Sequence, residues 1–219
     1  MSTRLRLFVA LYPPPLVAQT YLAHIKSFLD AQSQYPFASS SKLVPESQMH
    51  LTLQFVGDID QRQLDETIES VKRAAAGCAL LECIPHSLVL HPFHGPVRLI
   101  ALQLACPPIM RELHARLTLR LARRPVKKSS KGYGKKSQSH QPLQPTEHND
   151  EIFWPHMTLA RFSPASPHRD ELDQIVAATG VEEVSWPRFT ASSIMLMQSV
   201  MTLSGARHSE LARIYLTKL

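Results

Sequence analysis

The chain has 219 residues, of which 44% are hydrophobic, and it carries a formal net charge of +6 at pH 7. This length is enough to bury one sizeable core, either in a single large domain or in two small lobes that share it. No apolar run approaches the roughly 20 residues of a membrane span, and the chain starts on a strand-like pattern rather than a signal peptide. We therefore expect a cytoplasmic protein whose positive charge favours an anionic partner.

The first half of the chain predicts alternating strands and helices. A strand, a helix, a strand, a helix and two short strands are expected, in this order, at 4–11, 13–29, 48–56, 61–76, 80–84 and 87–93. The prolines at 13–15 suit the first turn of the first helix. Gly57 and Asp58 are expected to end the second strand, and Asp60 is placed to cap the second helix.

The same plan then begins again. The segment 98–104 resembles the first strand, and Pro107 and Pro108 precede a helix, as the earlier prolines do. The later elements are expected to be a strand that contains His156, a helix, and three further strands, the last four at 167–178, 184–189, 193–198 and 211–216. The repetition predicts two similar α+β lobes.

A four-residue motif occurs once in each repeat, as His-Leu-Thr-Leu at 50–53 and as His-Met-Thr-Leu at 156–159. Successive side chains of a strand point to opposite faces, so the histidine and the threonine of each motif share a face. One such motif occurs often by chance, but two copies at corresponding places indicate function. Two imidazoles that face one cleft, each beside a hydroxyl donor, are suited to act as general acid and general base on a phosphodiester.

The positive charge is concentrated in one dense block. The segment 125–150 is rich in Lys, Ser, Gln, Gly, Pro and His, and we expect it to be a flexible loop insertion in the second repeat. Together with the residues before it, this segment contains Arg120, Arg123, Arg124, Lys127, Lys128, Lys131, Lys135 and Lys136. Such a block is typical of a polyphosphate contact and equally of a solvated loop.

The motifs and their surroundings resemble those of the 2H phosphoesterases, and within that superfamily those of the bacterial RNA 2',3'-cyclic phosphodiesterases, also called 2'-5' RNA ligases. The resemblance covers nearly the whole chain. It rests on the segments 7–10, 44–46, 50–57 and 153–161, and on the spacing of Leu196, Ser199, Gly205 and Leu211. The chain departs from the family pattern in its long basic segment, in Ala101 where an aromatic residue is common, and in His208 where a tyrosine is frequent.

This resemblance implies an α+β fold of two pseudo-symmetric lobes, with mainly antiparallel sheets around a central cleft, in a single domain over 1–219. It implies metal-independent hydrolysis of RNA 2',3'-cyclic phosphate ends to 2'-phosphomonoesters, with 2'-5' ligation as the reverse reaction, by a monomer without a cofactor. His50 would be the proton donor and His156 the proton acceptor. Thr52, Thr158 and Arg161 would bind the phosphate of the substrate.

The position of Arg161 conflicts with strict alternation, which places it on the face opposite His156. A twist, a bulge or the end of the strand would have to bring its side chain round. Both a substrate contact and a surface role stay open for this residue.

Several other features have two interpretations. His91 and His94 suggest a metal pair, but the proline between them favours a turn beside the cleft. Tyr12, Phe153 and Trp154 are candidates for stacking on a base, although core packing is the commoner role of such residues. The cysteines, Cys78, Cys83 and Cys106, lack metal-ligand spacing and are expected to be reduced.

Two other functions remain as alternatives. The chain would act on 2'-5' oligonucleotides or small cyclic nucleotides, or it would be an RNA-binding module that keeps the cleft without turnover. The presence of both His-Thr pairs argues against a silent module.

Overall fold

The structure is a computed structural model that describes residues 3–35, 38, 41–122, 153–162, 172, 185–203 and 205–217. The basic segment 125–150 lies outside these ranges, and so does the helix predicted over 167–178, except for the buried Leu172. No helix in the described ranges is long and apolar enough to cross a bilayer.

Apart from one short extra strand, the described strands and helices follow the order that the sequence predicts. The strands are β1 (Arg4–Leu11), β2 (Ser41–Leu43), β3 (Leu51–Asp60), β4 (Leu81–Cys83), β5 (Pro85–His91), β6 (Leu99–Leu104), β7 (His156–Phe162), β8 (Phe189–Ala191), β9 (Ser193–Thr202) and β10 (Gly205–Tyr215). The helices are α1 (Pro15–Ala31), α3 (Leu64–Ala75) and α4 (Pro108–Leu121), with the 3-10 turns η1 (Glu46–Gln48) and η2 (Gln61–Gln63). Asp60 and Gln63 form the capping box that starts η2 and leads into α3, as expected of Asp60.

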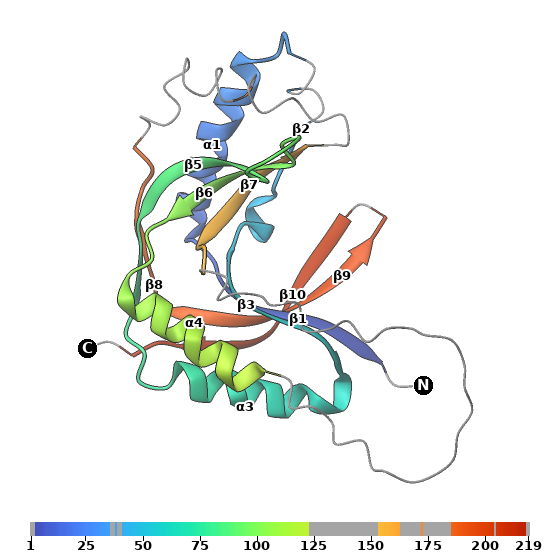
Figure 1. The fold of residues 1–219 in the computed structure, drawn as a ribbon, viewed down its shortest axis with the longest axis vertical. Helices are drawn as coiled ribbons and strands as arrows, with labels where there is room; N and C mark the ends of the chain where they lie inside the picture. Colours follow the sequence, from blue (N-terminus) through green and yellow to red (C-terminus); the bar gives the residue numbers. More distant parts are fainter. Residues whose placement is uncertain are drawn as a thin grey trace.

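One sheet runs through the molecule in the order β10-β9-β1-β3-β7-β6-β5, with β2 also paired to β7, and β4 pairs with β8 in a separate small sheet (Figure 1). The pairs within these sheets are antiparallel. The long sheet has two halves, because β3 and β7 are paired only through Leu51 and Met157. The mainly antiparallel α+β fold of two lobes is therefore confirmed.

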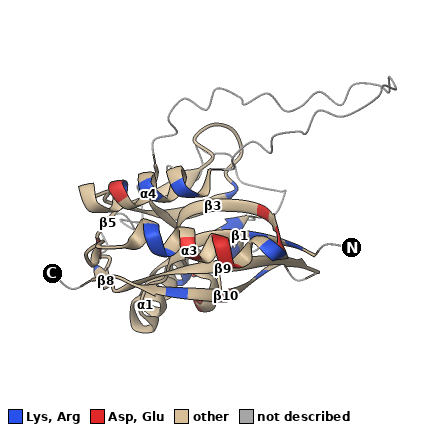
Figure 2. Cartoon of the chain, turned by 90° about the horizontal axis from the view of Figure 1, so that it is seen from below, with Lys and Arg blue, Asp and Glu red and all other residues tan. Residues whose placement is uncertain are grey.

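Two helices contact the half of the sheet that does not contain the strand preceding them. Helix α1 follows β1, yet it contacts β7 in the other half, while α4 follows β6 and contacts β3. Helix α3 packs against α4, and the two lie together below the sheet in Figure 1. Acidic and basic residues are interspersed along both helices (Figure 2), which is typical of helices with one solvated face.

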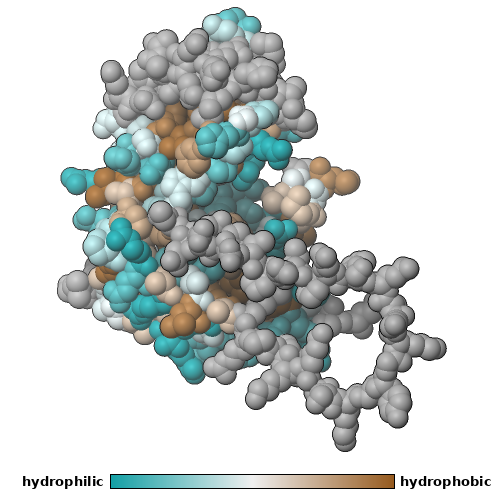
Figure 3. Space-filling model, in the orientation of Figure 1, coloured by the Kyte–Doolittle hydropathy of each residue, from teal (hydrophilic) through white to brown (hydrophobic). Residues whose placement is uncertain are grey.

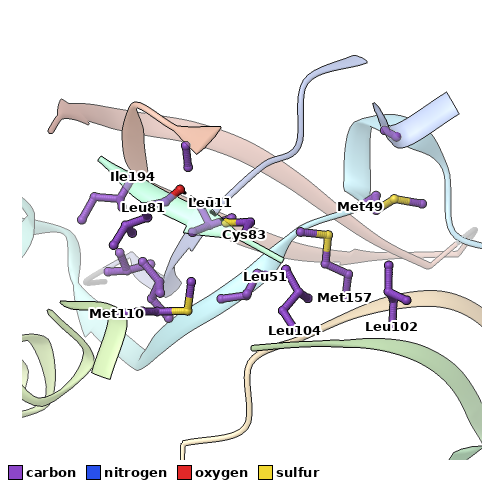
Figure 4. Close-up of a cluster of buried hydrophobic side chains, with 14 of the residues drawn as sticks. Leu11, Met49, Leu51, Leu81, Cys83, Leu102, Leu104, Met110, Met157 and Ile194 are labelled. Carbon is purple, nitrogen blue, oxygen red and sulfur yellow. Dashed lines mark hydrogen bonds between the residues drawn. The ribbon is translucent and has the colours of Figure 1, made fainter. Parts of the chain in front are cut away.

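The hydrophobic core is continuous across the two halves. Leu51 and Met157 are fully buried at the junction and belong to the same cluster as Leu102 and Leu104 from β6 and Leu11 from β1 (Figure 4). A buried leucine of this kind contributes about 2–5 kcal/mol to stability, judged by its replacement with alanine. The junction that holds the two motifs thus lies within the buried core.

The limits of two predicted strands are wrong for a physical reason. The strand predicted over 48–56 starts only at Leu51, because Glu46–Gln48 form the 3-10 turn η1. Strand β3 does not end at Gly57 and Asp58 but continues to Asp60, because Gly57 has a φ of 81° and lies beside a register shift, so the chain forms a bulge rather than a turn. The strand predicted over 184–189 starts only at Phe189. Pro187 lacks an N–H for the ladder, and its carbonyl oxygen accepts a hydrogen bond from the Tyr21 hydroxyl at 2.5 Å.

Three further strands differ from the prediction. The polar stretch before β3 contains the short strand β2, which pairs with β7. Strands β9 and β10 are both longer than predicted, and together they form a hairpin that projects beyond β1 (Figure 1). Its tip is apolar and exposed, with Met201 and Leu203 at the surface.

Candidate active site

The pairing of Leu51 with Met157 places both motifs on one face of the sheet. Directly opposed residues of an antiparallel pair point to the same side, and both Leu51 and Met157 are fully buried in the core. The residues on either side of them therefore point to the other face. These residues are His50, Thr52, His156 and Thr158, and all of them are half-buried.

The two motifs are related by a local pseudo-two-fold symmetry that extends to the neighbouring strands. Thr52 pairs with Ala10 of β1, and Thr158 pairs with Ala101 of β6. Both alanines are fully buried, and both leave room beside a threonine hydroxyl. In each half the register then shifts at the leucine that follows the threonine, so each motif ends in a bulge.

Each motif histidine is held by the main chain two residues before it. The Nδ1 atom of His50 lies 2.6 Å from the carbonyl oxygen of Gln48, and Nδ1 of His156 lies 2.9 Å from that of Trp154. A carbonyl oxygen only accepts hydrogen bonds, so Nδ1 carries a proton in both rings. In the neutral state both Nε2 atoms consequently have a free lone pair, which is the form required of a base.

The ring of His50 contacts other aromatic rings and lies beside a small apolar cluster. Its ring centroid is 5.0 Å from that of Phe8, 5.4 Å from that of Tyr12 and 5.1 Å from that of His208. Phe8 belongs to a buried cluster with Ala10, Met195 and Met197 on this face of the sheet. Burial is the main cause that lowers the pKa of His50 to about 4. The hydrogen bond to the Gln48 carbonyl opposes this shift, and the nearby His208, Arg161 and His156 add to it.

His156 is held by a second aromatic group. Its ring stacks on that of Trp154, with 3.9 Å between the ring centroids. His91 also stacks on Trp154, at a centroid distance of 5.3 Å. Burial lowers the pKa of His156, and His91 and Arg161 add to this effect. Both motif histidines are therefore less basic than an exposed histidine in the absence of an anion.

A bulge brings Arg161 to the histidine face. Ala160 pairs with Ile100 and Thr158 pairs with Ala101, so Leu159 is an extra residue in β7. Leu159 and Ala160 both point into the core, and the side chain of Arg161 is exposed. Its positive charge is among the causes that lower the pKa of His50, His156 and His208, which agrees with a place on the histidine face. Of the two positions that the sequence leaves open for Arg161, the structure has the one beside the histidines.

The candidates for base stacking are engaged within the protein. Trp154 stacks on both His156 and His91, and Phe153 stacks on His114 at 4.2 Å. The Nδ1 atom of His114 lies 2.7 Å from the Leu53 carbonyl oxygen, which ties α4 to β3. For these aromatic residues the structure agrees with the packing role.

The remaining sequence candidates are easily placed. His91 ends β5 and precedes a series of bends, beside Trp154 and at the edge of the site, in agreement with a turn beside the cleft. Cys78, Cys83 and Cys106 are free thiols, the first two buried.

Sequence reasoning missed two parts of the site. The carbonyls of Gln48 and Trp154, which fix the tautomers of the histidines, are main-chain groups and have no signal in the side-chain pattern. His208 was visible only as a departure from the family pattern, although its ring contacts both His50 and Phe8. In the space-filling view the surface is hollowed between the projecting β9–β10 hairpin and the half that contains β7 (Figure 3).

Known proteins share this architecture. The sequence model of the LigT-like phosphoesterases matches residues 23–82, which include the first motif. The fold is similar to TT0787 of Thermus thermophilus, with a TM-score of 0.64 and 19% identity over 97% of this chain and 98% of that one. It is similar to E. coli LigT complexed with phosphate, with a TM-score of 0.63 and 18% identity over 99% of this chain and 100% of that one.

A further structure, E. coli LigT complexed with 3'-AMP, has a TM-score of 0.63 and 19% identity over 99% of this chain and 100% of that one. No curated protein matches the sequence. The resemblance to the 2H phosphoesterases that the sequence indicates is thereby confirmed, and the structural matches show that it extends to the fold of the whole chain.

Proposed function

We propose that this chain, which has the LigT-like 2H phosphoesterase fold, hydrolyses RNA 2',3'-cyclic phosphate ends to 2'-phosphomonoesters without a metal ion. One observation carries the proposal: two imidazoles lie on one sheet face, related by the Leu51–Met157 pair, and each has Nδ1 hydrogen-bonded to a main-chain carbonyl, so that the neutral ring has its lone pair on Nε2. Diagonal neighbours on adjacent strands are roughly 7–8 Å apart, which leaves room for a phosphate between the two rings.

The reaction needs one proton acceptor and one proton donor. We assign His156 Nε2 as the base that takes a proton from water as its oxygen attacks phosphorus. The bond between phosphorus and the 3'-oxygen then breaks, and His50 Nε2–H gives its proton to the departing oxygen. The products are a 2'-phosphomonoester and a 3'-hydroxyl, and the two histidines return to their starting state by proton exchange with water.

The second requirement is stabilisation of the negative charge that develops on the phosphate. The non-bridging oxygens gain charge as water adds, and the hydroxyls of Thr52 and Thr158 are placed on the same face to donate to them. Arg161 supplies a guanidinium, whose planar fork of N–H donors suits the oxygens of a phosphate. Ring strain in the cyclic ester supplies the driving force, so no nucleotide cofactor is needed, and joining of 2'-5' ends is the reverse of the same step.

The low proton affinity of His50 sets a condition on this scheme. With a pKa of about 4, His50 is neutral in the free protein at pH 7, whereas a proton donor must be protonated. The bound phosphate has to raise this pKa to about 7, which corresponds to about 4 kcal/mol. A bound anion raises the pKa of His50, because its negative charge offsets the repulsion from Arg161 and stabilises the protonated ring in its buried position.

A second candidate is the same chemistry on 2'-5' oligonucleotides or small cyclic nucleotides. The ligands of E. coli LigT in its solved complexes, phosphate and 3'-AMP, support a nucleotide phosphate as the ligand here and suit either substrate class. The basic segment before β7 favours RNA, since it offers several cations to a longer phosphate chain. We propose further that the protein is a monomer in the cytoplasm.

The test is hydrolysis of defined substrates in the presence of EDTA. An oligonucleotide that ends in a 2',3'-cyclic phosphate, a 2'-5' dinucleotide and a free 2',3'-cyclic mononucleotide would be compared, with the position of the product phosphate mapped. The proposal predicts turnover of the first substrate to a 2'-phosphate. Preference for the 2'-5' dinucleotide would favour the second candidate, and no turnover of any substrate would favour the binding module.

A further inference from the structure

His208 is a third histidine in the site, and it comes from the strand at the edge of the sheet. It lies on β10, which is separated from β3 by β9 and β1. Its ring nevertheless makes an edge-to-face contact with His50 at 5.1 Å and another with Phe8 at 4.9 Å. The β9–β10 hairpin therefore curls over the histidine face, and the ring of His208 becomes part of the wall beside the proposed proton donor.

His208 differs from the motif histidines in the hydrogen bonding of its Nδ1 atom. Its Nδ1 atom is buried and has no hydrogen-bond partner among the described residues. A buried N–H without an acceptor is rarer and more costly than a buried lone pair without a donor. The proton of the neutral ring therefore belongs on Nε2, which leaves the lone pair on Nδ1. His50 and His156 present an acceptor at Nε2, whereas His208 presents a donor.

The surroundings also disfavour the doubly protonated ring. An imidazolium would bury a charge together with an unpartnered Nδ1–H. Burial and the guanidinium of Arg161 on β7 lower the pKa of His208. The other titratable groups beside His208 are His50, Tyr12 just after β1, and Glu210 on β10, whose carboxylate pairs with Arg213. Burial raises the pKa of Tyr12, and Glu210 adds to this effect.

We propose that His208, in its neutral form, donates a hydrogen bond from Nε2 to the phosphate of the substrate beside His50, and that it neither gives nor takes a proton during the reaction. This inference rests on the proposed function for the identity of the ligand. A neutral N–H donor fits a site in which His50 must gain a proton, because it binds the anion without adding a second positive charge next to His50. The residue thus acts on the affinity for the phosphate and not on the proton balance.

Two substitutions separate the hydrogen bond from the packing. His208→Phe keeps an aromatic ring against Phe8 and His50 but has no donor, whereas His208→Tyr adds a hydroxyl donor that does not titrate below about pH 9. His86→Phe on the exposed surface of β5 is the matched control. With a 2',3'-cyclic mononucleotide, we expect His208→Phe to lower kcat/KM by about 10- to 100-fold, the usual value of a hydrogen bond to a charged group. We expect the tyrosine variant to keep most of the activity.

The pH dependence decides between a neutral donor and a titrating one. The loss in His208→Phe should be of the same size at each pH between 5 and 9, since a neutral donor is present throughout this range. A loss confined to acid pH would show that His208 acts as an imidazolium and would overturn the inference. Equal activity of the wild-type protein and His208→Phe would overturn it too.

A measurement without turnover keeps this inference separate from the proposed reaction. In protein with 15N-labelled histidine, the ring resonances distinguish a proton on Nδ1 from one on Nε2, and the variants assign each ring. We expect the proton on Nδ1 in His50 and His156 and on Nε2 in His208, with the His208 Nε2–H resonance shifting when inorganic phosphate is added. If these results hold but no cyclic phosphate is hydrolysed, the proposed function fails and this inference stands. A proton on Nδ1 of His208, or no response to phosphate in an active enzyme, refutes the inference alone.

Discussion

The buried position of His50 makes the stability of the protein depend on pH in a way that one substitution can isolate. The pKa of His50 is about 4 in the folded protein and 6.5 in the unfolded chain. Between these values the unfolded state binds more protons than the folded state, so the free energy of unfolding falls as the pH falls through this window. Integration of the two titrations gives a loss of about 2 kcal/mol between pH 7 and pH 5 from this residue alone.

His50→Gln removes the titration while keeping a polar side chain. We expect the variant to be less stable than the wild-type protein at pH 7, where it lacks the hydrogen bond to Gln48, and to recover about 2 kcal/mol relative to it at pH 5. Urea denaturation followed by tryptophan fluorescence at both pH values measures this difference, with His86→Gln as the exposed control. A difference between wild type and His50→Gln that does not change with pH would refute the assignment of a low proton affinity to His50.

Three other predictions follow from the charges around the site. If bound phosphate raises the pKa of His50, the basic limb of kcat will lie at higher pH than that of kcat/KM, and coincident limbs would contradict this. Arg161→Gln should lower kcat/KM by about 10- to 100-fold. Because it removes a positive charge that lowers the pKa of both histidines, it should also move the acid limb of the pH profile to higher pH. An unchanged profile would exclude Arg161 from the site. Changing the five lysines within 127–136 to glutamine should flatten the salt dependence of binding to long RNA, by about 0.7 in the log–log slope for each lost phosphate contact. Hydrolysis of a short cyclic nucleotide should be unaffected. An equal loss on both substrates would contradict a role in RNA binding.

Much of the fold could be predicted because its periodicity is local. The alternation of β1, the prolines before α1 and α4, and the capping by Asp60 each depend on a few neighbouring residues. The repeated motif gave the faces of His50 and His156 from the period of a strand. The limits of β3 were wrong because a glycine at positive φ is compatible with both a turn and a bulge, and the choice between them depends on the partner strand β1.

The rest of the site depends on contacts between residues far apart in the sequence. Strict alternation gave the wrong face for Arg161, since the bulge at Leu159 appears only in the pairing of β7 with β6. The contact of His208 with His50 requires the curl of the β9–β10 hairpin, which no local pattern encodes. The proton affinity of His50 is lowered mainly by burial, which is a property of the assembled site and not of the motif.

The most direct test of the two-histidine mechanism is single-turnover hydrolysis of an oligonucleotide with a 2',3'-cyclic phosphate end in EDTA, by the wild-type protein, His50→Ala and His156→Ala. Folding of each variant would be confirmed by circular dichroism, and His86→Ala would serve as the control. We predict a 2'-phosphate product from the wild-type protein and a loss of about 10²- to 10⁴-fold in each motif variant, the usual contribution of a positioned acid or base. A folded motif variant with wild-type turnover, or a wild-type activity abolished by the chelator, would contradict the mechanism.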